Sequence, residues 1–592
     1  MTPARTPATS RQGSSNRRVG FWYAVLVVVM ALMIARLFYL QIVKHDYYRQ
    51  TALADQQREY SIPAERGTIK AHDGGQQALL VLNEELYTLY VDPVYIKDPT
   101  NDSVKLAAIT GGGAEDYGKA MRRTDSRYVV LEKRLSEDKK DQIMALKRPG
   151  VATQAVHYRA YPQGALAAQL LGFVNDEAKG NYGIEQALNS QLAGTSGRLK
   201  AITDAKGVPL AASPGNIEIS PLAGSDVVLS LELAMQKQLE NILKAGLEKA
   251  KSTSGSAVIM DANTGAIKAM ANLPTYNPGE YFKVDDQSVF NNASVSSPLE
   301  VGSVMKVLTA AAALDMGAIA ADTTFYDPGR WELNDHTITN IEEVGGPGTR
   351  TIPQVLDRSI NTGATWMLMQ MGGKTGTVNK QARERWHDYL VNHYQFGKPT
   401  GIEQGYEASG TVPDPNDGFA LELAYANASF GQAMTATPLQ MAAALAAAVN
   451  GGTYYQPRLV DEITTPDGKT KAPPPKVVRK GVVSTKVSGQ IQGMMQYVVA
   501  NHRPQPPFSD KYMVGGKTGT AQIANPAGGY FEHKFNGTYI GFVGGDRPEY
   551  VVVIVVKEPK IGGYAGSAAA QPIFWQLAHM LINNFDVSPK NS

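Results

Sequence analysis

One long apolar segment close to the N-terminus constrains what this chain can fold into. Residues Phe21 to Val43 are almost wholly apolar and are interrupted only by Arg36 and Gln41. As a helix this segment is about 34 Å long, which is enough to cross a lipid bilayer. Arg36 stands near its far end, where a long cationic side chain reaches the interface. No other stretch approaches spanning length, so the sequence predicts a single transmembrane anchor at residues 21–43.

The charges before this segment predict its orientation. Residues 1–20 carry arginines and no acidic residue. The arginines are Arg5, Arg11, Arg17 and Arg18. The positive-inside rule therefore places residues 1–20 in the cytoplasm as a short tail, and the body of the chain on the other side of the membrane. A cleaved signal peptide is the alternative, but the segment is long for one and Met33–Leu37 offers no small-x-small cleavage site.

The composition of the chain excludes several classes of function. A length of 592 residues is too long for one domain, and 43% hydrophobic with 19% charged residues is enough to bury several cores. A net charge of +2 gives no argument for nucleic acid as a partner. The absence of cysteine excludes disulfides and thiolate catalysis, and the nine histidines show no metal-ligand spacing. We expect neither a metal nor a cofactor.

The first candidate site residues are Ser303 and Lys306, which stand just before the apolar run 307–314. If this run is a helix, the two side chains share one face. A serine hydroxyl becomes a nucleophile when a base takes its proton, and a neutral lysine can be that base. A serine at a helix start also lies beside free backbone N–H groups that can stabilise an oxyanion. Alone, a Ser-x-x-Lys pattern is more often a solvated helix face.

A second candidate element, Ser359-Ile-Asn361, follows downstream. The Ser359 hydroxyl can relay a proton between Lys306 and a leaving amine. The Asn361 amide both accepts and donates hydrogen bonds, so it can hold a lysine and a substrate amide together. Taken alone, serine and asparagine at such positions are more often helix N-caps. In register with the other elements, we favour the catalytic interpretation.

The third element occurs twice, as Lys374-Thr-Gly376 and as Lys517-Thr-Gly519. Neither copy is a P-loop, because the first glycine of that motif would fall on Leu368 or Lys511. We choose the later copy, because residues 513–522 precede two predicted strands and can form the edge of a sheet beside the site.

On such a sheet edge the later copy has a plausible chemistry. Lys517 supplies a positive charge, and Thr518 and Thr520 offer hydroxyls to a carboxylate. Gly519 is expected to let a substrate lie against the backbone.

The three elements stand in the order of the active-site signature of the penicillin-recognising serine acyltransferases, so the chain resembles a penicillin-binding protein. The resemblance implies that Ser303 is the nucleophile and Lys306 the general base. It also implies that the backbone N–H groups of Ser303 and Thr520 form the oxyanion hole. To act as a base, Lys306 must have a pKa well below its ordinary value, through burial or through a nearby cation such as Lys517.

Several fragments before the first candidate element resemble the non-catalytic pedestal of class B penicillin-binding proteins. They are Arg66–Ile69 with Asp73 and Gly74, Tyr158–Pro162, Leu171–Val174, Gly183–Glu185, and Leu192–Gly194. Ala71-His72 departs from this pattern, because the family usually has Asp-Arg there. We therefore expect a dimerisation-like pedestal domain at 44–225 and a transpeptidase domain at 226–592. The layout is closest to the division-specific branch of the family.

The second of these domains shows strand patterns at both ends and helices between them. The predicted elements are a strand at 226–231, a helix at 233–251, a hairpin of 256–260 with 266–270, a hairpin of 539–543 with 550–556, and a final helix at about 568–584. This order predicts an α+β fold in which one antiparallel sheet, built from both ends of the domain, is covered by helices. The transpeptidase fold that the resemblance implies has this architecture.

The resemblance implies a membrane-anchored D,D-transpeptidase of the inner (plasma) membrane, with its catalytic domain periplasmic or extracellular. Its ligands are peptidoglycan stem peptides, as D-Ala-D-Ala donor and amine acceptor, and beta-lactams that acylate Ser303. Expected partners are the membrane, a membrane glycan polymerase and other division proteins. Three alternatives stay open, namely an elongation-type enzyme of the same class, a hydrolase, and a beta-lactam sensor or scaffold without crosslinking turnover.

Overall fold

A computed structural model describes residues 13–123, 125–202, 217–333, 335–340, 346–502 and 506–590. Arg5 and Arg11 of the expected cytoplasmic tail lie outside the described residues. The chain divides into two units. The first comprises Met1–Ala64 and Thr195–Leu222, and the second comprises Glu65–Gly194 and Ala223–Ser592.

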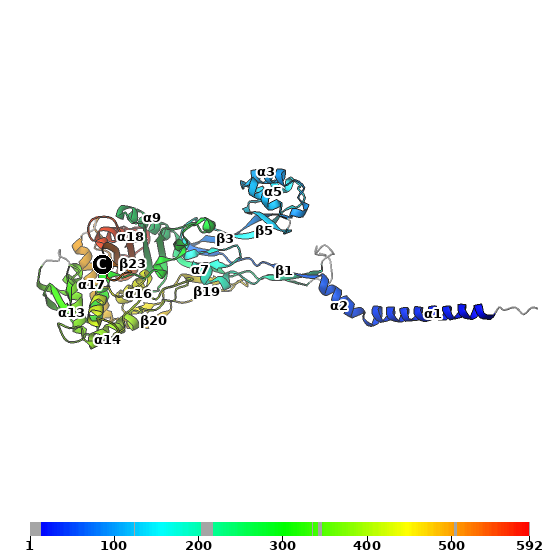
Figure 1. Cartoon of the computed structure of the whole chain (residues 1–592). Helices are drawn as coiled ribbons and strands as arrows, with labels where there is room; N and C mark the ends of the chain where they lie inside the picture. The colour runs from blue at the N-terminus through cyan, green and yellow to red at the C-terminus, as the bar shows by residue number, and fades with distance from the viewer. Residues whose placement is uncertain are drawn as a thin grey trace, which may run out of the picture. The chain divides into compact units, whose positions relative to one another are not determined.

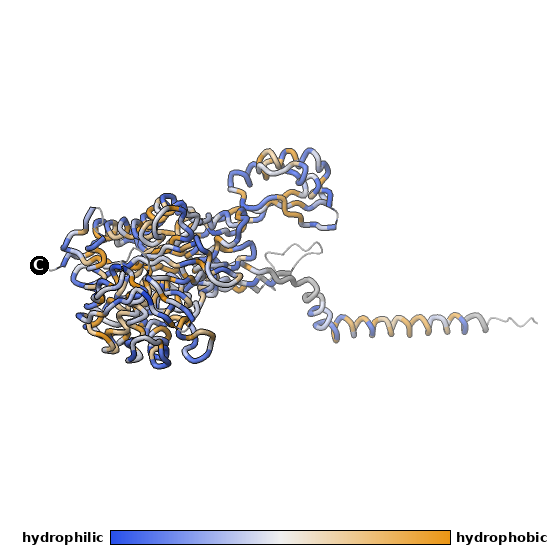
Figure 2. Tube along the Cα trace, turned by 60° about the vertical axis from the view of Figure 1, so that its left-hand side comes forward, coloured by the Kyte–Doolittle hydropathy of each residue, from blue (hydrophilic) through white to orange (hydrophobic). Residues whose placement is uncertain are grey.

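The apolar segment of the first unit folds as a long helix, as the sequence predicted. α1 (Gly13–Phe38) continues into the π-helical turn η1 (Tyr39–Val43), and Arg17–Val43 form a helical stretch of 27 residues that is apolar enough to cross a membrane. Its large hydrophobic side chains are exposed, and the hydropathy colouring of Figure 2 shows hydrophobic residues recurring along the coloured part of the helix. A helix that is hydrophobic on all sides and unburied needs lipid around it. The described part of the chain therefore contains one N-terminal helix that is suited to anchor it in a membrane.

The first unit also contains the helix α2 (His45–Gln56) and a small antiparallel sheet in the order β1-β8-β9. The strands of this sheet are β1 (Gln57–Ile62), β8 (Gly197–Ile202) and β9 (Ile217–Ile219). β1, which follows the anchor in sequence, thus pairs with β8, which comes after the pedestal-like fragments along the chain. β8 in turn pairs with β9.

A five-stranded antiparallel sheet, in the order β12-β11-β23-β22-β21, organises the second unit. Its strands are β11 (Ser254–Asp261), β12 (Ile267–Leu273), β21 (Met513–Ala524), β22 (Tyr530–Gly544) and β23 (Pro548–Lys557). The all-apolar run of β23 fits its central place, because Val551 and Val553 pack into one core while Val552 and Ile554 pack into another. The predicted antiparallel sheet built from distant parts of the sequence is confirmed.

Helices cover both faces of this sheet. Figure 1 shows α9 (Leu233–Ala250) and α18 (Gln571–Asn584) on one side of β23 and α16 (Pro438–Val449) on the other. α16 is buried along its whole length, which explains why it is apolar all round. The other helices on the α16 side are α11 (Met305–Asp315), α12 (Ile352–Asp357), α13 (Asn361–Met371), α14 (Lys380–Asp388), α15 (Leu421–Ala428) and α17 (Thr485–His502). The final helix begins at Gln571, slightly later than predicted, because the π-helical turn η8 (Gly566–Ala570) precedes it.

A second sheet runs through the pedestal-like fragments in the order β19-β18-β10-β2-β3-β4, with β5 also paired to β3. Its strands are β2 (Ile69–Asp73), β3 (Gln76–Val91), β4 (Val129–Leu135), β5 (Val151–Ala160), β10 (Asp226–Glu232), β18 (Val460–Thr464) and β19 (Thr470–Lys471). β10 was predicted as the strand that opens the catalytic domain. It pairs in parallel with β2 and antiparallel with β18, so strands from both sides of residue 225 share this sheet.

The outer part of this sheet carries its own small core. The helices α3 (Pro99–Thr110), α4 (Ala114–Met121) and α5 (Glu137–Ala145) pack against β3 and β4 around Leu89, Leu106 and Ile143. The remaining short elements are α6 (Ala168–Leu171), α7 (Gly183–Ala187), α8 (Asn189–Leu192), α10 (Ala293–Ser296), β6 (Phe173–Val174), β7 (Gly180–Asn181), β13 (Thr324–Asp327), β14 (Arg330–Leu333), β15 (His336–Thr339), β16 (Gly348–Thr351), β17 (Thr453–Tyr455) and β20 (Val477–Lys480).

The pedestal-like fragments converge on one buried carboxylate. Glu185 is fully buried, and it accepts hydrogen bonds from Arg66 Nε at 2.7 Å and from Arg159 Nε at 2.8 Å. A buried charge persists only with such partners, because its desolvation is costly. His72, which stands where the family usually has a basic residue, lies 2.8 Å from the Asp461 carboxylate on β18.

Candidate active site

Ser303 lies in a tight turn that leads directly into a helix, as the sequence predicted. The turn is the 3-10 segment η5 (Gly302–Val304), and α11 follows it. Gly302 has φ +67°, and a Cβ atom there would lie 2.8 Å from the carbonyl oxygen of Thr520 on β21. Glycine is therefore required at this position both by its backbone conformation and by the close approach of β21 to the turn.

Lys306 contacts Ser303 and both residues of the second element, Ser359 and Asn361. Its Nζ lies 3.0 Å from Ser303 Oγ, and it donates hydrogen bonds to the Ser359 carbonyl oxygen at 2.6 Å and to Asn361 Oδ1 at 2.7 Å. The Ser359 hydroxyl lies 3.2 Å away. The Lys306 side chain is fully buried, so these contacts replace its hydration.

Ser359 and Asn361 are not helix caps, which removes the structural alternative for this element. Ile360 is the N-cap residue of α13, and Asn361 is the first helical residue. Asn361 Nδ2 donates to the Thr339 carbonyl oxygen at 3.0 Å, which orients the amide oxygen toward Lys306. Ser359 has φ +57°, a strained conformation for a residue with a side chain.

The later Lys-Thr-Gly copy reaches the site, and the earlier copy does not. Lys517 is 1% exposed on β21, the edge strand of the five-stranded sheet. Its Nζ donates to Ser359 Oγ at 3.1 Å and to the Thr518 carbonyl oxygen at 2.9 Å. Lys374 is exposed in a turn after α13 and does not line the cavity.

The two lysines have lowered pKa values, for physical reasons that the geometry supplies. Burial, followed by the nearby charge of Lys517, holds the pKa of Lys306 well below its ordinary value. Burial lowers the pKa of Lys517 to about 7, while the Asp357 carboxylate raises it. The sequence predicted the direction for Lys306 and both of its causes. The pair can therefore hold one neutral amine beside Ser303 and one ammonium on β21 near neutral pH.

The free edge of β21 presents the remaining groups of the third element. The Thr520 carbonyl oxygen faces Gly302, on the side away from β22. In an antiparallel strand the N–H and C=O groups of one residue point to the same side, so the Thr520 N–H also faces this edge. The Thr520 hydroxyl accepts a hydrogen bond from the Gly566 N–H at 3.0 Å.

Packing gives a reason for a glycine at position 519 that the sequence did not suggest. A Cβ atom on Gly519 would lie 2.2 Å from Thr538 Oγ1 on β22, 2.8 Å from the Val301 carbonyl oxygen and 3.0 Å from Val304 Cγ1. The absence of a side chain thus lets β21 pack closely against the turn at residues 301–304 that carries Ser303, which we call the nucleophile turn.

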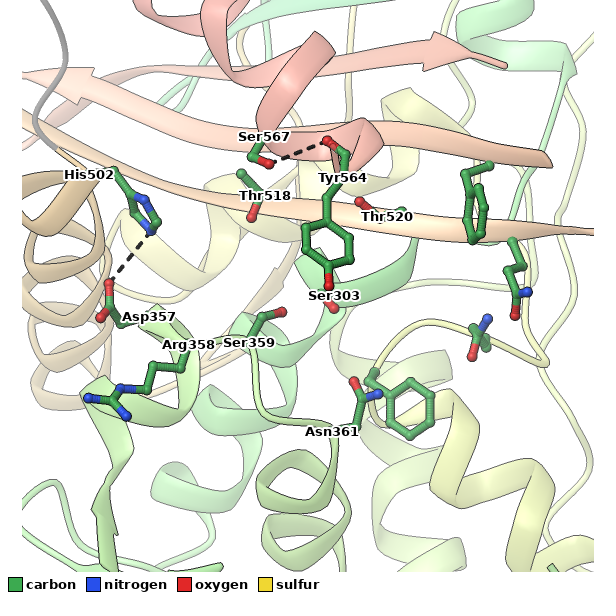
Figure 3. A pocket seen from close by; sticks show the side chains of 14 residues that line it. Ser303, Asp357, Arg358, Ser359, Asn361, His502, Thr518, Thr520, Tyr564 and Ser567 are labelled. Carbon is green, nitrogen blue, oxygen red and sulfur yellow. Dashed lines mark hydrogen bonds and ion pairs between the residues drawn. The ribbon is translucent and has the colours of Figure 1, made fainter. Parts of the chain in front are cut away.

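These groups surround a cavity of about 520 Å³. Figure 3 shows Ser303, Ser359 and Asn361 below it and Thr518 and Thr520 on the strand above it. The sequence analysis assigned no role to the other lining residues, which are Asp357, Arg358, Phe430, Gln432, His502, Gln522, Phe535, Tyr564 and Ser567. Asp357 stands two residues before Ser359 along the chain, and this proximity is the sequence signal that could have found it.

Glu300 is a further residue that the sequence analysis left without a role. Its Oε1 accepts hydrogen bonds from the Ala433 N–H at 2.8 Å and from the Tyr530 hydroxyl at 2.9 Å. Ala433 has φ +57° and follows Gln432, which lines the cavity. Glu300 therefore ties three segments together close to Ser303: its own turn, the loop at 430–433 and the β21–β22 hairpin.

Comparison with known proteins shows which family the chain belongs to. Residues 255–579 match the penicillin binding protein transpeptidase domain, and residues 61–229 match the penicillin-binding protein dimerisation domain. Stage V sporulation protein D of Bacillus subtilis is 30% identical over 98% of this chain and 87% of its own length. Penicillin-binding protein PbpB of Mycobacterium tuberculosis is 30% identical over 96% of this chain and 85% of its own length. The peptidoglycan D,D-transpeptidase FtsI of Escherichia coli is 25% identical over 99% of this chain and 95% of its own length.

Solved structures share the fold. Penicillin-binding protein 2X from Streptococcus thermophilus superposes with a TM-score of 0.71 at 22% identity, and the match covers 89% of this chain and 80% of that one. Penicillin-binding protein 3 from Mycobacterium tuberculosis, complexed with aztreonam, gives a TM-score of 0.66 at 25% identity over 90% and 98% of the two chains.

Proposed function

Because this chain belongs to the class B penicillin-binding proteins, we propose that it is a membrane-anchored, serine-type peptidoglycan D,D-transpeptidase in which Ser303 forms the acyl-enzyme. The observation that carries the proposal is the contact of Lys306 Nζ with Ser303 Oγ at 3.0 Å inside a fully buried environment. A buried, neutral amine at hydrogen-bonding distance is what a serine needs to become a nucleophile.

The first step is acylation. Two N–H groups of Lys306 donate to the Ser359 carbonyl and to Asn361, which leaves the lone pair of the neutral amine for the Ser303 hydroxyl. The Ser303 oxygen forms a bond to the carbonyl carbon of the penultimate D-Ala, and its proton moves to Lys306. When the bond to the terminal D-Ala breaks, the proton passes through the Ser359 hydroxyl to the leaving amine.

The second step exchanges the ester for a crosslink. The amine of a neighbouring stem peptide attacks the acyl carbon and gives its proton back through Ser359 and Lys306 to the departing Ser303 oxygen. In both steps the backbone N–H groups of Ser303 and Thr520 stabilise the negative charge on the carbonyl oxygen. The outward direction of the Thr520 backbone supports this role.

Peptidoglycan is the substrate, and beta-lactams bind to the protein. Lys517, Thr518 and Thr520 bind the terminal carboxylate of the donor peptide, because they combine one ammonium with two hydroxyls along one strand edge. Gly519 holds this edge against the nucleophile turn, at the distance that its missing side chain allows. A beta-lactam carries a carboxylate and an acylating carbonyl, so it occupies the same positions and acylates Ser303.

The anchor fixes the protein in a membrane, and its charges suggest the orientation. Arg17 and Arg18 lie at the N-terminal end of the helix, before its apolar segment, which favours a cytoplasmic N-terminus and a catalytic domain on the outer side of the inner (plasma) membrane. Likeness to the division and sporulation proteins FtsI and Stage V sporulation protein D supports a role in septal wall synthesis. A membrane glycan polymerase and other division proteins are the proposed partners. We assign residues 44–225 to the pedestal and residues 226–592 to the transpeptidase domain.

The test is labelling with fluorescent penicillin followed by product analysis. The protein is expected to become labelled, and the label is expected to disappear in Ser303→Ala and to persist in Ser567→Ala, which alters another hydroxyl of the same cavity. With a donor pentapeptide, addition of an acceptor amine is expected to yield a crosslinked peptide. Labelling that survives in Ser303→Ala contradicts the nucleophile. Products unchanged by the amine identify a hydrolase, and labelling without any product identifies a sensor.

A further inference from the structure

A second cavity, of about 500 Å³, lies at one end of the five-stranded sheet. Its walls come from the ends of β11, β12 and β23, from the segment 286–297 that crosses over them, and from Tyr406. None of its lining residues lines the catalytic cavity. Its volume is in the range of sites that bind small ligands.

The sheet face beneath this cavity changes from apolar to polar. Over most of its length this face packs into the core through Val258, Met270, Val551 and Val553. On the same face, nearer to the cavity, β11 presents Ser256 and Ser254, β12 presents Asn272, and β23 ends with Lys557. Three neighbouring strands thus change character at one end, and core packing does not require this change.

One of these polar groups has no hydrogen-bond partner in the described part of the chain. Ser256 is only 2% exposed, and its hydroxyl makes no hydrogen bond with any residue that the structure describes. The Ser256 oxygen is not among the fully buried side-chain atoms that lack a partner, so it reaches the cavity and can bond to a molecule bound there. Because Ser256 lines the cavity, a bound molecule can provide that partner.

Lys557 brings a positive charge to the same wall. It is half-buried, and burial lowers its pKa. No carboxylate in the described part of the chain forms an ion pair with it. Asp286 also lines the cavity, but its carboxylate is exposed and accepts a hydrogen bond from the Ser288 N–H at 2.9 Å. The ammonium therefore remains available to an anionic ligand.

The rest of the lining defines the kind of ligand. Tyr406 is 66% exposed, so its ring offers a flat surface at the cavity. The hydroxyls of Ser288 and Ser297 can donate and accept hydrogen bonds. The Ser296 hydroxyl already donates to the Asn292 carbonyl oxygen and can only accept, while the Asn291 amide donates to the Ser288 carbonyl oxygen and keeps its second N–H and its oxygen. A flat ring, many hydroxyls and one ammonium together suit a sugar ring linked to a carboxylate.

We propose that this cavity binds a carboxylate-bearing glycopeptide segment of the peptidoglycan strand, away from the bond that the enzyme exchanges. The choice of ligand rests on the proposed function, because the substrate polymer combines sugar rings with peptide carboxylates. The carboxylate pairs with Lys557, the sugar lies against Tyr406, and its hydroxyl or amide groups satisfy Ser256. Only residues 298–302 separate Ser297, in this cavity, from Ser303 along the chain.

The test measures binding to the full-length protein in detergent micelles after penicillin has acylated Ser303. Acylation, verified by mass, blocks the catalytic cavity. A soluble disaccharide pentapeptide is then titrated by calorimetry. Saturable binding is expected, and Lys557→Gln is expected to weaken it at least tenfold. Lys560→Gln, the same change at an exposed lysine outside the cavity, is expected to leave the affinity unchanged.

A second variant tests the sugar. Tyr406→Ala is expected to weaken binding of the disaccharide pentapeptide and to leave the affinity for the free pentapeptide unchanged. Absence of binding to the acylated protein, or equal affinity of the wild type and Lys557→Gln, overturns the proposal. Equal penicillin acylation rates show that the variants are folded. A wrong proposed function would show at an earlier step: penicillin would then add no mass to the protein before any glycopeptide is titrated.

Discussion

The ammonium group of Lys517 donates a hydrogen bond to the Ser359 hydroxyl across 3.1 Å, although 158 residues separate the two along the chain. The same hydroxyl lies 3.2 Å from Lys306 Nζ. One oxygen thus connects the two lysines. The strained backbone of Ser359, at φ +57°, directs its carbonyl to Lys306 while its hydroxyl reaches Lys517. Strain of this kind persists only where the surroundings hold it.

Removal of that oxygen is expected to slow acylation without unfolding the protein. In Ser359→Ala the proton relay between Lys306 and the leaving group is lost, and loss of a positioned proton-transfer group typically costs roughly 10²–10⁴-fold in rate. The measurement is the second-order rate of penicillin acylation, with the melting temperature as the check on folding.

Ser567→Ala is the matched control for this relay. Ser567 lines the same cavity, but its hydroxyl donates to the Tyr564 carbonyl oxygen at 3.3 Å and contacts neither lysine. We expect its acylation rate to stay within about threefold of the wild type. Equal rates for the two variants contradict the relay.

The pH dependence of the reaction is expected to respond to Asp357. Binding of the substrate carboxylate requires a protonated Lys517, whose pKa burial lowers to about 7 and Asp357 raises. In Asp357→Asn that raising effect disappears, so Lys517 loses its proton at a lower pH. The alkaline limb of kcat/KM is therefore expected to move to lower pH, with a higher KM near pH 7. A pH–rate profile measures both.

Asp285→Asn is the control for that profile, because Asp285 is exposed and lies outside the catalytic cavity. His502, at 3.7 Å from the Asp357 carboxylate, is the other titratable side chain that faces it. An alkaline limb that stays in place in Asp357→Asn refutes the electrostatic role of this carboxylate.

Substitutions at two glycines with the same φ distinguish the cost of backbone strain from the cost of lost packing at the nucleophile turn. Gly302 and Gly317 both have φ +67°, but a Cβ atom on Gly317 meets nothing within 4 Å, whereas one on Gly302 would lie 2.8 Å from the Thr520 oxygen. Gly317→Ala is expected to cost about 1 kcal/mol in unfolding free energy, from the backbone alone. Gly302→Ala is expected to cost more and to slow acylation, because it pushes β21 away from Ser303.

Urea unfolding and penicillin acylation, measured on both variants, distinguish these effects. If Gly302→Ala costs no more than Gly317→Ala and acylates at the normal rate, the contact between the turn and β21 is unimportant for the site.

The buried carboxylate of the pedestal is expected to stabilise that part of the protein. Glu185→Gln leaves Arg66 and Arg159 buried without their counter-charge, and breaking a buried ion pair from one side costs about 3–5 kcal/mol. Urea unfolding measures the loss. Glu177→Gln, at an exposed position, is the control and is expected to change little. A Glu185→Gln variant as stable as this control shows that the cluster contributes nothing to the fold.

Local sequence patterns were sufficient for much of the fold. The apolar run before Lys44, the hairpin pattern of β11 and β12, and the apolar run of β23 each predict their element, because these signals act over a few residues. The contact of Lys306 with Ser303 also follows from helical spacing. The motif order then identified the family, and the position of Lys517 before two strands was enough to choose it over Lys374.

The tertiary structure decided what depends on segments far apart in the sequence. The pairing of β10 with β2, the contact of Gly519 with the nucleophile turn, and the influence of Asp357 on Lys517 have no local signal. Each depends on how the whole core packs, and packing alone sets the distance between groups that no repeat connects. The sequence by itself therefore determined the elements and the reacting residues. Only the folded chain determined their burial, and with it the charge states on which the chemistry depends.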